Sequence, residues 1–455
     1  MHERLKTIIQ NTKEIFSIDF LDRISKKTGF VKRKGKITAE TFLSFNTFSS
    51  SDLCETSLAT LCSRLSSQFN IDISAQALNE RFNECSVKFM QEIFNSIMIK
   101  QNNILTKQSN KLHFNRILVN DATSYGLPLN FYDEFKGSGG ARSKAAIKIQ
   151  LQYNLLSGSF LCCDIDNGTS SDGKYVETMD KYTKPGDLRL SDLGYYKVAY
   201  LKKIDDKKAF FISKLKSTSI VYKKNPSPRT KANGEILKST EYIKIDILEI
   251  IKPLADGETI ELKNVYIGSK KELKTRLIIT KLSEENKKKR EIKHLKAVKR
   301  GRGTVNDKSI AWNGINVYIT NVPEEILSTE EIHDIYTLRW QVEIMFKIWK
   351  SIFNIDNVKP VKLERFKCFL YGRLISLIFS SIIVFTAKDI IYEEESKEIS
   401  EIKSFSQVTE FFNRLRTEIF KGELAILKLL KAIINTIRKL GIKSKKKVRK
   451  VLMKY

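Results

Sequence analysis

The chain has 455 residues, of which 42% are hydrophobic, so it can bury a substantial core and is not a disordered polymer. Its formal net charge is +28, with 80 Lys and Arg against 52 Asp and Glu, which favours nucleic acid as a partner over an anionic membrane. None of its six cysteines forms a C-x-x-C pair, and no H-E-x-x-H motif is present, which argues against zinc sites and disulfides.

Two segments bear on where the protein works. The N-terminal residues MHERLKTIIQ lack the apolar core of a signal peptide. The most apolar stretch, Leu374 to Ala387, has 14 residues, which is too short to cross a bilayer and is typical of a core helix. We therefore expect a cytoplasmic protein with reduced thiols and no membrane partner.

Residues 1–110 are predicted to form a helical DNA-binding domain. Leu58, Leu61 and Leu65 are spaced as one helix face, and Ser74 can cap a second helix after the break at residues 70–72. Two short helices around a tight break resemble a helix-turn-helix. The alternative is an ordinary helical hairpin, which has the same pattern.

Residues 111–216 change to short β-rich runs, at 114–121, 146–155, 159–168, 187–196 and 208–216. Helical stretches lie at 173–182 and 197–203, between the last three of these runs. Three strands, a helix, a strand, a helix and a strand is the order of a ribonuclease H-like core. The pattern by itself indicates a mixed α/β fold, in which 111–216 form the first part of the core.

Residues 217–312 are predicted to be a β-rich insertion that ends in a basic segment. Strand-like runs lie at 242–251 and 276–283. The basic residues that we expect to bind DNA are Lys287, Lys288, Lys289, Arg290, Arg300 and Arg302. The alternative is a solvated, charged linker.

The core is predicted to resume over 313–375, with a strand at 314–323 and one long helix from about Ser328 to about Phe353. Residues 376–455 should form a helical, basic C-terminal region that ends in KSKKKVRK (443–450).

The segment YTLRWQVEIMFKIWK (336–350) carries most of the functional argument. At about 100° per residue, Tyr336, Arg339, Glu343 and Lys350 share a sector about 60° wide, opposite a core face that includes Trp349. A carboxylate can hold a divalent metal, Arg and Lys can bind phosphates, and a tyrosine can donate to phosphate or stack on a base. The alternative is a surface helix with ordinary intrahelical ion pairs.

The spacing Tyr-x2-Arg-x3-Glu-x6-Lys resembles the signature of the DDE transposases in the insertion-sequence-four family, and the segment 339–360 resembles their Gram-positive subgroup. NDATSYGLP (120–128) resembles the strand that ends in the first catalytic Asp, which would be Asp121. GDLRLSDLGYY (186–196) resembles the second-Asp segment and indicates Asp192, with Asp187 as the competitor because Leu193 stands where Arg is usual.

The resemblance implies that Asp121, Asp192 and Glu343 are catalytic and together hold two Mg²⁺ or Mn²⁺ ions. It also implies nicking at a transposon end, hairpin formation, hairpin opening and insertion. Tyr336, Arg339 and Lys350 would contact DNA, and Trp340 and Trp312 are candidates to stack on a flipped base. A core position is the alternative for Trp312.

The implied partner is double-stranded DNA, both terminal inverted repeats and target, bound by a homodimer beside the bacterial nucleoid. One rival is a DDE nuclease that cleaves without strand transfer. The other is a catalytically silent DNA-binding protein derived from a transposase, against which the intact carboxylates and the Tyr, Arg and Lys argue.

Overall fold

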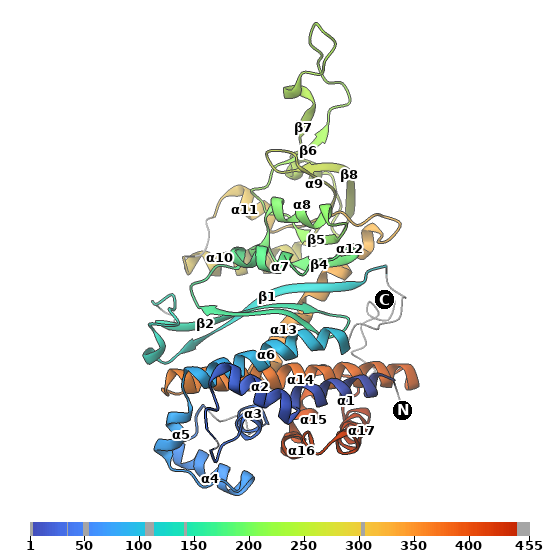
Figure 1. Cartoon of the computed structure of the whole chain (residues 1–455). Coiled ribbons are helices and arrows are strands. Elements are labelled where there is room, and N and C mark those ends of the chain that lie inside the picture. The colour runs from blue at the N-terminus through green and yellow to red at the C-terminus, as the bar shows by residue number, and fades with distance from the viewer. Residues whose placement is uncertain are drawn as a thin grey trace. The chain divides into compact units, whose positions relative to one another are not determined.

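The computed structural model describes residues 3–33, 35–48, 54–104, 113–140, 143–301 and 305–443 (Figure 1). The chain divides into two compact units. Unit 1 contains Met1–Ser109, Ala122–Ser170 and Gln341–Lys454, and unit 2 contains Asn110–Asp121, Ser171–Trp340 and Tyr455. The division falls inside one strand and again just before one helix, so each unit is built from segments far apart in the sequence.

Unit 1 is mainly helical. Its N-terminal helices are α1 (Glu3–Phe16), α2 (Ile18–Thr28), α3 (Ala39–Phe48), α4 (Leu58–Phe69), α5 (Ala75–Arg81) and α6 (Glu84–Ile104). Its C-terminal helices are α13 (Gln341–Ser351), α14 (Leu363–Glu395), α15 (Glu401–Glu410), α16 (Phe412–Glu418) and α17 (Glu423–Leu440). The 3-10 turn η1 (Leu129–Phe131) and the antiparallel strands β2 (Ala145–Asn154) and β3 (Phe160–Asn167) complete it.

Helix α14 is the core helix of unit 1, as the apolar run 374–387 predicted. It is long and apolar enough to cross a membrane, but 94% of its most apolar 18-residue stretch is buried inside the structure. It packs against α6 and α3, and Phe379 forms edge contacts with Phe16 and Phe48. The helix spans 33 residues, so burial, not shortness, identifies it as a core element.

Helices α4 and α5 form the predicted pair around a tight break. Asn70, with φ 55°, ends α4 in the left-handed conformation that Asn tolerates better than most residues. The Ser74 hydroxyl accepts a hydrogen bond from the Ala77 backbone N–H at 3.2 Å and so caps α5. Leu61, Leu65 and Leu78 are buried beneath the two helices.

Unit 2 is built on a mixed sheet. Its strands are β4 (Asp187–Ser191), β5 (Phe210–Lys214), β6 (Val221–Lys224), β7 (Tyr242–Lys244), β8 (Thr259–Ile267), β9 (Leu273–Lys281) and β10 (Ile315–Thr320). Strand β1 (Arg116–Leu127) belongs to unit 2 through Asp121 and to unit 1 from Ala122 onward. Among the described residues the hydrogen-bonded strand order is β3-β2-β1-β4-β5-β10-β9-β8-β6-β7.

Short helices and 3-10 turns connect these strands. They are η2 (Asp172–Tyr175), α7 (Val176–Asp180), η3 (Leu193–Tyr195), α8 (Val198–Asp206), η4 (Lys238–Thr240), α9 (Ile247–Ile251), α10 (Glu284–Lys299), α11 (Asp307–Trp312), α12 (Thr329–Thr337) and η5 (Leu338–Trp340). Side chains from α7 and α8, such as Met179 and Leu201, pack against apolar residues of the sheet.

The order of the first five strands confirms the predicted ribonuclease H-like core. Strands β1 and β4 are parallel, as are β4 and β5, and the crossovers between them contain α7 and α8. Strands β6 to β9 lie between β5 and β10 in the sequence, which agrees with a β-rich insertion. The run 242–251 is only partly a strand, because Asp246 accepts a hydrogen bond from the Leu248 N–H and starts α9.

The prediction of one long helix from Ser328 to Phe353 is wrong. The structure has α12, then the 3-10 turn η5, then α13. Tyr336 lies on α12, Arg339 on η5, and Glu343 and Lys350 on α13. A 3-10 turn advances about 120° per residue, so the sector calculated for a continuous helix holds only within α13.

Candidate active site

Asp121 and Asp192 occupy matching positions directly after the last residue pair of the parallel strands β1 and β4, where Asp121 lies within β1 and Asp192 follows the end of β4. Asn120 on β1 pairs with Ser191 on β4, and each aspartate directly follows its member of this pair. Asn120 and Ser191 are buried. Successive side chains of a strand point to opposite faces, so the two aspartates share the other face, with strands about 4.8 Å apart. The predicted first and second acidic residues are therefore brought together.

Asp187, the competing candidate for the second acidic residue, is held in a buried ion pair. It is fully buried at the start of β4. Its two carboxylate oxygens accept hydrogen bonds from Arg116, from Nε at 2.8 Å and from Nη2 at 2.6 Å, and Oδ2 also accepts from the Lys184 backbone N–H at 2.7 Å. A carboxylate engaged in this way is a poor metal ligand, whereas Asp192 is exposed.

Arg339 places a guanidinium beside Asp121. Its Nη1 lies 3.1 Å from Asp121 Oδ2, and only 8% of the Arg339 side chain is exposed. The guanidinium carbon also lies 5.0 Å from the ring centroid of Trp340, which is half exposed. Two of the predicted DNA-binding residues, Arg339 and Trp340, thus lie side by side next to the first acidic residue.

Tyr336 is buried and supports the end of β4. Its hydroxyl donates a hydrogen bond to the Ser191 backbone carbonyl at 3.2 Å. Burial raises the pKa of Tyr336 well above its ordinary value, and the neighbouring Asp192 adds to this effect. Through Ser191, Tyr336 fixes the strand end from which Asp192 projects.

Lys214 is a cation of this region that the sequence analysis did not find. Ser213 on β5 pairs with Ser191 on β4, so Lys214 follows its partner in the same register as Asp192. Its ammonium lies 5.8 Å from the ring centroid of Tyr336. Burial and the nearby Arg290 lower the pKa of Lys214, and Asp192 acts in the opposite direction. Only the strand register shows this proximity, because 22 positions separate residues 192 and 214 in the sequence.

Helix α13 carries the predicted third acidic residue in unit 1. Glu343 is exposed in its first turn, and Lys350 follows two turns later. The Lys350 ammonium donates a hydrogen bond to the Ser124 carbonyl at 3.2 Å. Trp349 is fully buried and its ring centroid lies 5.7 Å from that of Phe160, so the predicted core face of this helix is confirmed.

The remaining predicted DNA-binding residues lie in several different environments. Trp312 is half-buried and packs against the core of unit 2, as its core alternative requires. Arg290 is not a free surface cation, because it donates to the Ile315 carbonyl at 2.9 Å and to Asn316 Oδ1 at 2.6 Å. Lys287 and Lys289 on α10 pair with neighbouring glutamates. Lys288 and Arg300 are exposed, and Arg302 lies outside the described residues.

The chemistry of the acidic residues suits a hard divalent cation, since carboxylate oxygens are the ligands that Mg²⁺ and Mn²⁺ prefer. Among the described residues, no group of three or more His, Cys, Asp or Glu lies close enough together to hold a metal ion. Asp121 and Asp192, side by side in the register of β1 and β4 in unit 2, supply two carboxylates. These two carboxylates therefore suit a divalent metal ion, and at least one further ligand would be needed to complete its coordination.

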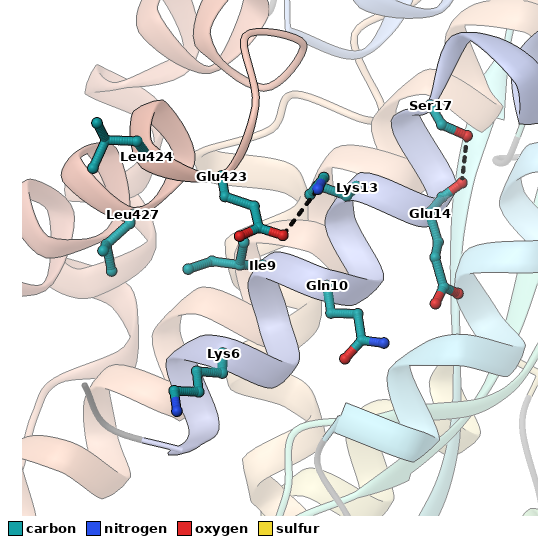
Figure 2. Close-up of a pocket in the computed structure, with 9 residues that line it drawn as sticks. All are labelled: Lys6, Ile9, Gln10, Lys13, Glu14, Ser17, Glu423, Leu424 and Leu427. Carbon is teal, nitrogen blue, oxygen red and sulfur yellow. Dashed lines mark hydrogen bonds and ion pairs between the residues drawn. The ribbon is translucent and has the colours of Figure 1, made fainter.

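A surface groove in unit 1 lies away from these residues. It has a volume of about 860 Å³ and runs between α1 and α17 (Figure 2). Lys13 and Glu423 form an ion pair of 2.9 Å across it. None of the predicted catalytic residues lines this groove, so the groove is not the candidate active site.

Comparison with known proteins identifies the family. The family model described as "Transposase DDE domain" matches residues 112–379, more than half of the chain. The chain belongs to this transposase family. It is 50% identical over 452 residues to the transposase for insertion sequence element IS1151 of Clostridium perfringens, covering 99% of this chain and 96% of that protein.

A second transposase relative, for insertion sequence element IS231F of Bacillus thuringiensis subsp. israelensis, is 36% identical over 447 residues, covering 98% of this chain and 93% of that protein. The chain is thus a DDE transposase of bacterial insertion sequences, an enzyme of a family that generally uses divalent metal ions. A solved piggyBac transposase synaptic complex with hairpin DNA aligns with 98% of this chain and 88% of that one, at TM-score 0.48 and 10% identity.

Proposed function

We propose that this transposase cuts its element out of DNA at the two terminal inverted repeats and joins the freed ends to a target. The observation that carries the proposal is the register of β1 and β4, which sets Asp121 and Asp192 side by side, each directly after the last residue pair of the two parallel strands. Near-full-length similarity to insertion-sequence transposases supports the element ends as the substrate.

Asp121, Asp192 and Glu343 would hold two Mg²⁺ or Mn²⁺ ions. When bound, such ions activate a water or 3′-hydroxyl and stabilise the leaving oxygen of an in-line phosphoryl displacement. The proposed sequence of reactions is nicking, hairpin formation by the freed 3′-hydroxyl, hairpin opening and insertion. No protein nucleophile is required, so the protein's own side chains bind and orient the strand.

Arg339 and Lys350 would bind phosphates of the transposon end. Arg339 offers a planar set of donors that is already oriented by Asp121, and Lys214 adds a point charge beside Asp192. Trp340 is half exposed and can stack on a base displaced from the duplex during hairpin formation. Tyr336 acts through Ser191 by holding the end of β4.

DNA binding outside the catalytic residues would come from helical and basic surfaces. We assign end recognition to the α4–α5 pair of the N-terminal domain and phosphate contacts to the unpaired cations of α10, such as Lys288. Cutting two ends of one element calls for a homodimer in the DNA complex. The reaction would take place in the cytoplasm, where bacterial DNA lies.

The experiment that tests this function uses the full chain, its element's terminal repeats and Mg²⁺, with strand-resolved analysis of products. A pre-cut end that is joined to target DNA supports transposition over a nuclease that only cleaves. Binding without any strand cleavage in Mg²⁺ or Mn²⁺ would instead indicate a catalytically silent DNA-binding protein.

A further inference from the structure

Four strands at the far edge of the unit 2 sheet place two tyrosines and two lysines in one row. Lys244 on β7 pairs with Tyr222 on β6, Tyr222 pairs with Tyr266 on β8, and Tyr266 pairs with Lys274 on β9. Cross-strand partners share a face of the sheet, so the four side chains lie side by side. We call the surface formed by Tyr222, Lys224, Tyr242, Lys244, Tyr266, Lys271 and Lys274 the outer face.

The opposite face of the same strands is closed by the core. Val221, Ile267 and Leu273, which alternate with the residues of the row, are buried in the apolar cluster of unit 2. Tyr222 and Tyr266 are half-buried, whereas Lys244 and Lys274 are exposed. The alternation therefore directs the aromatic and basic side chains outward.

Lys271 ties the tyrosines of the outer face together. Its ammonium lies 5.1 Å from the ring centroid of Tyr222 and 4.6 Å from that of Tyr242. Tyr242 in turn makes an edge contact with Tyr266, with centroids 5.0 Å apart. Lys271 has φ 56°, a left-handed conformation that is costly for lysine, so the turn accepts backbone strain while holding this arrangement.

The exposed lysines of the outer face are available to an anionic partner. Lys224, Lys244 and Lys274 are exposed, and none of them forms an ion pair with a described residue. On α10, the segment that the sequence favoured, Lys287 and Lys289 are paired with glutamates, whereas Lys288 is exposed. Two half-buried glutamates, Glu241 and Glu272, adjoin Tyr242 and Lys271 in the sequence.

The strands β6 and β7 continue into an arm, residues 225–241, that projects from unit 2 (Figure 1). An isolated bridge between Thr230 and Ile236 holds its two sides together near the tip. The arm itself contains three Lys or Arg and two Glu, so its net charge of +1 has the same sign as that of the outer face. A two-stranded β-ribbon is one of the shapes that the major groove of DNA admits.

We propose that the outer face and its arm form a second DNA-binding surface, which binds duplex DNA beside the cleavage point. The proposal rests on the transposase function proposed above and adds a contact remote from the carboxylates. The lysines would bind the phosphate backbone of DNA without reading its sequence, and the packed tyrosines would hold the lysines in place. Five strand spacings of about 4.8 Å separate β4 from β6, so the contact lies roughly 24 Å, or about seven base pairs, from the scissile phosphate.

The test compares two triple variants with the native full-length chain. The first is Lys224→Gln, Lys244→Gln and Lys274→Gln. The matched control is Lys181→Gln, Lys184→Gln and Lys203→Gln, which removes the same charge from exposed positions at or near α7 and α8, on the other side of the sheet. Thermal melts check that all three proteins fold alike.

Binding to a duplex terminal repeat, with flanking DNA, is measured against salt concentration, together with phosphate-modification interference. The outer-face variant should bind more weakly at every salt concentration and lose about three units of salt slope, one for each lysine. It should also lose interference about seven base pairs from the cut, whereas the control variant retains both.

A native slope and native interference pattern in the outer-face variant would overturn the proposal, as would a loss confined to single-stranded DNA. Metal-dependent nicking at saturating DNA is recorded in the same series. Absence of nicking by the native chain would count against the proposed function. The binding comparison would still show whether the outer face binds DNA.

Discussion

Arg339 and Asp121 form an ion pair within unit 2, with 3.1 Å between Arg339 Nη1 and Asp121 Oδ2. The cation thus occupies one oxygen of a carboxylate that we assign to metal binding. Such a pair orients the Asp121 carboxylate, and it competes with any incoming metal. Arg339 therefore has two proposed roles, one before the metal binds and one when DNA is present.

Arg339→Ala should slow cleavage and strand transfer by about a hundredfold or more, because the reacting strand loses a positioning contact. The same change should lower the Mn²⁺ concentration needed for half-maximal metal binding without DNA, since a competing cation is removed. Calorimetric Mn²⁺ titration and a strand-transfer assay test the two effects. A variant with normal transfer and unchanged metal affinity would contradict both roles.

Asp187→Asn and Asp192→Asn should separate structure from chemistry. Asp187 is buried against Arg116, so its neutralisation leaves a cation poorly compensated and should reduce the free energy of unfolding by about 3–5 kcal/mol. Asp192 is exposed, and its variant should melt like the native chain while cutting no DNA. Our assignment is wrong if Asp192→Asn cleaves normally and a folded Asp187→Asn does not.

Lys214→Gln should reduce the rate of strand transfer more than the affinity for the transposon end. Lys214 follows the residue paired with Ser191 and adds positive charge next to Asp192. We expect a loss of about tenfold to a hundredfold, typical of a positioning contact near the reacting groups. Partial rescue in Lys214→Arg, with normal melting of both variants, would support a charge contact; equal loss in both would not.

Trp349→Ala should destabilise unit 1, whereas Lys350→Ala should not. Removing the fully buried indole leaves a cavity beside Phe160 and Phe346 and should cost about 3–5 kcal/mol of unfolding free energy. Lys350 is half-buried and donates one hydrogen bond to a backbone carbonyl, so its variant should melt almost normally and transfer strands poorly. An early melt for Lys350→Ala with a stable Trp349→Ala would contradict the orientation of α13.

Local patterns of the sequence predicted much of this fold. Short β-rich runs predicted the five strands of the core, and Ser74 predicted the start of α5. Trp349 was predicted to be buried from its position on the helix face. These features depend on neighbours within one or two turns, and such neighbours are visible in a single sequence.

Features that depend on distant residues were not predicted. The apolar periodicity continues through both α12 and α13, so it did not show the break at η5. The proximity of Lys214 to Asp192 follows only from the register of β4 and β5. The charge pattern of α10 did not show that Arg290 turns into the sheet and donates to the Ile315 carbonyl. The outer face was missed because its tyrosines and lysines come from four strands and a turn, which come together only after folding.

The most direct test incubates the native chain, Asp121→Asn, Asp192→Asn and Glu343→Gln with DNA carrying the element's own terminal repeat. Strand-resolved products are compared in Mg²⁺, Mn²⁺, Ca²⁺ and excess EDTA. We predict nicks at the repeat boundary and a hairpin product for the native chain in Mg²⁺ or Mn²⁺, little chemistry in Ca²⁺, and none in EDTA. The three variants should bind the repeat and leave both strands intact. Full cleavage in excess EDTA, or by any of the three variants, would contradict a metal-dependent carboxylate site.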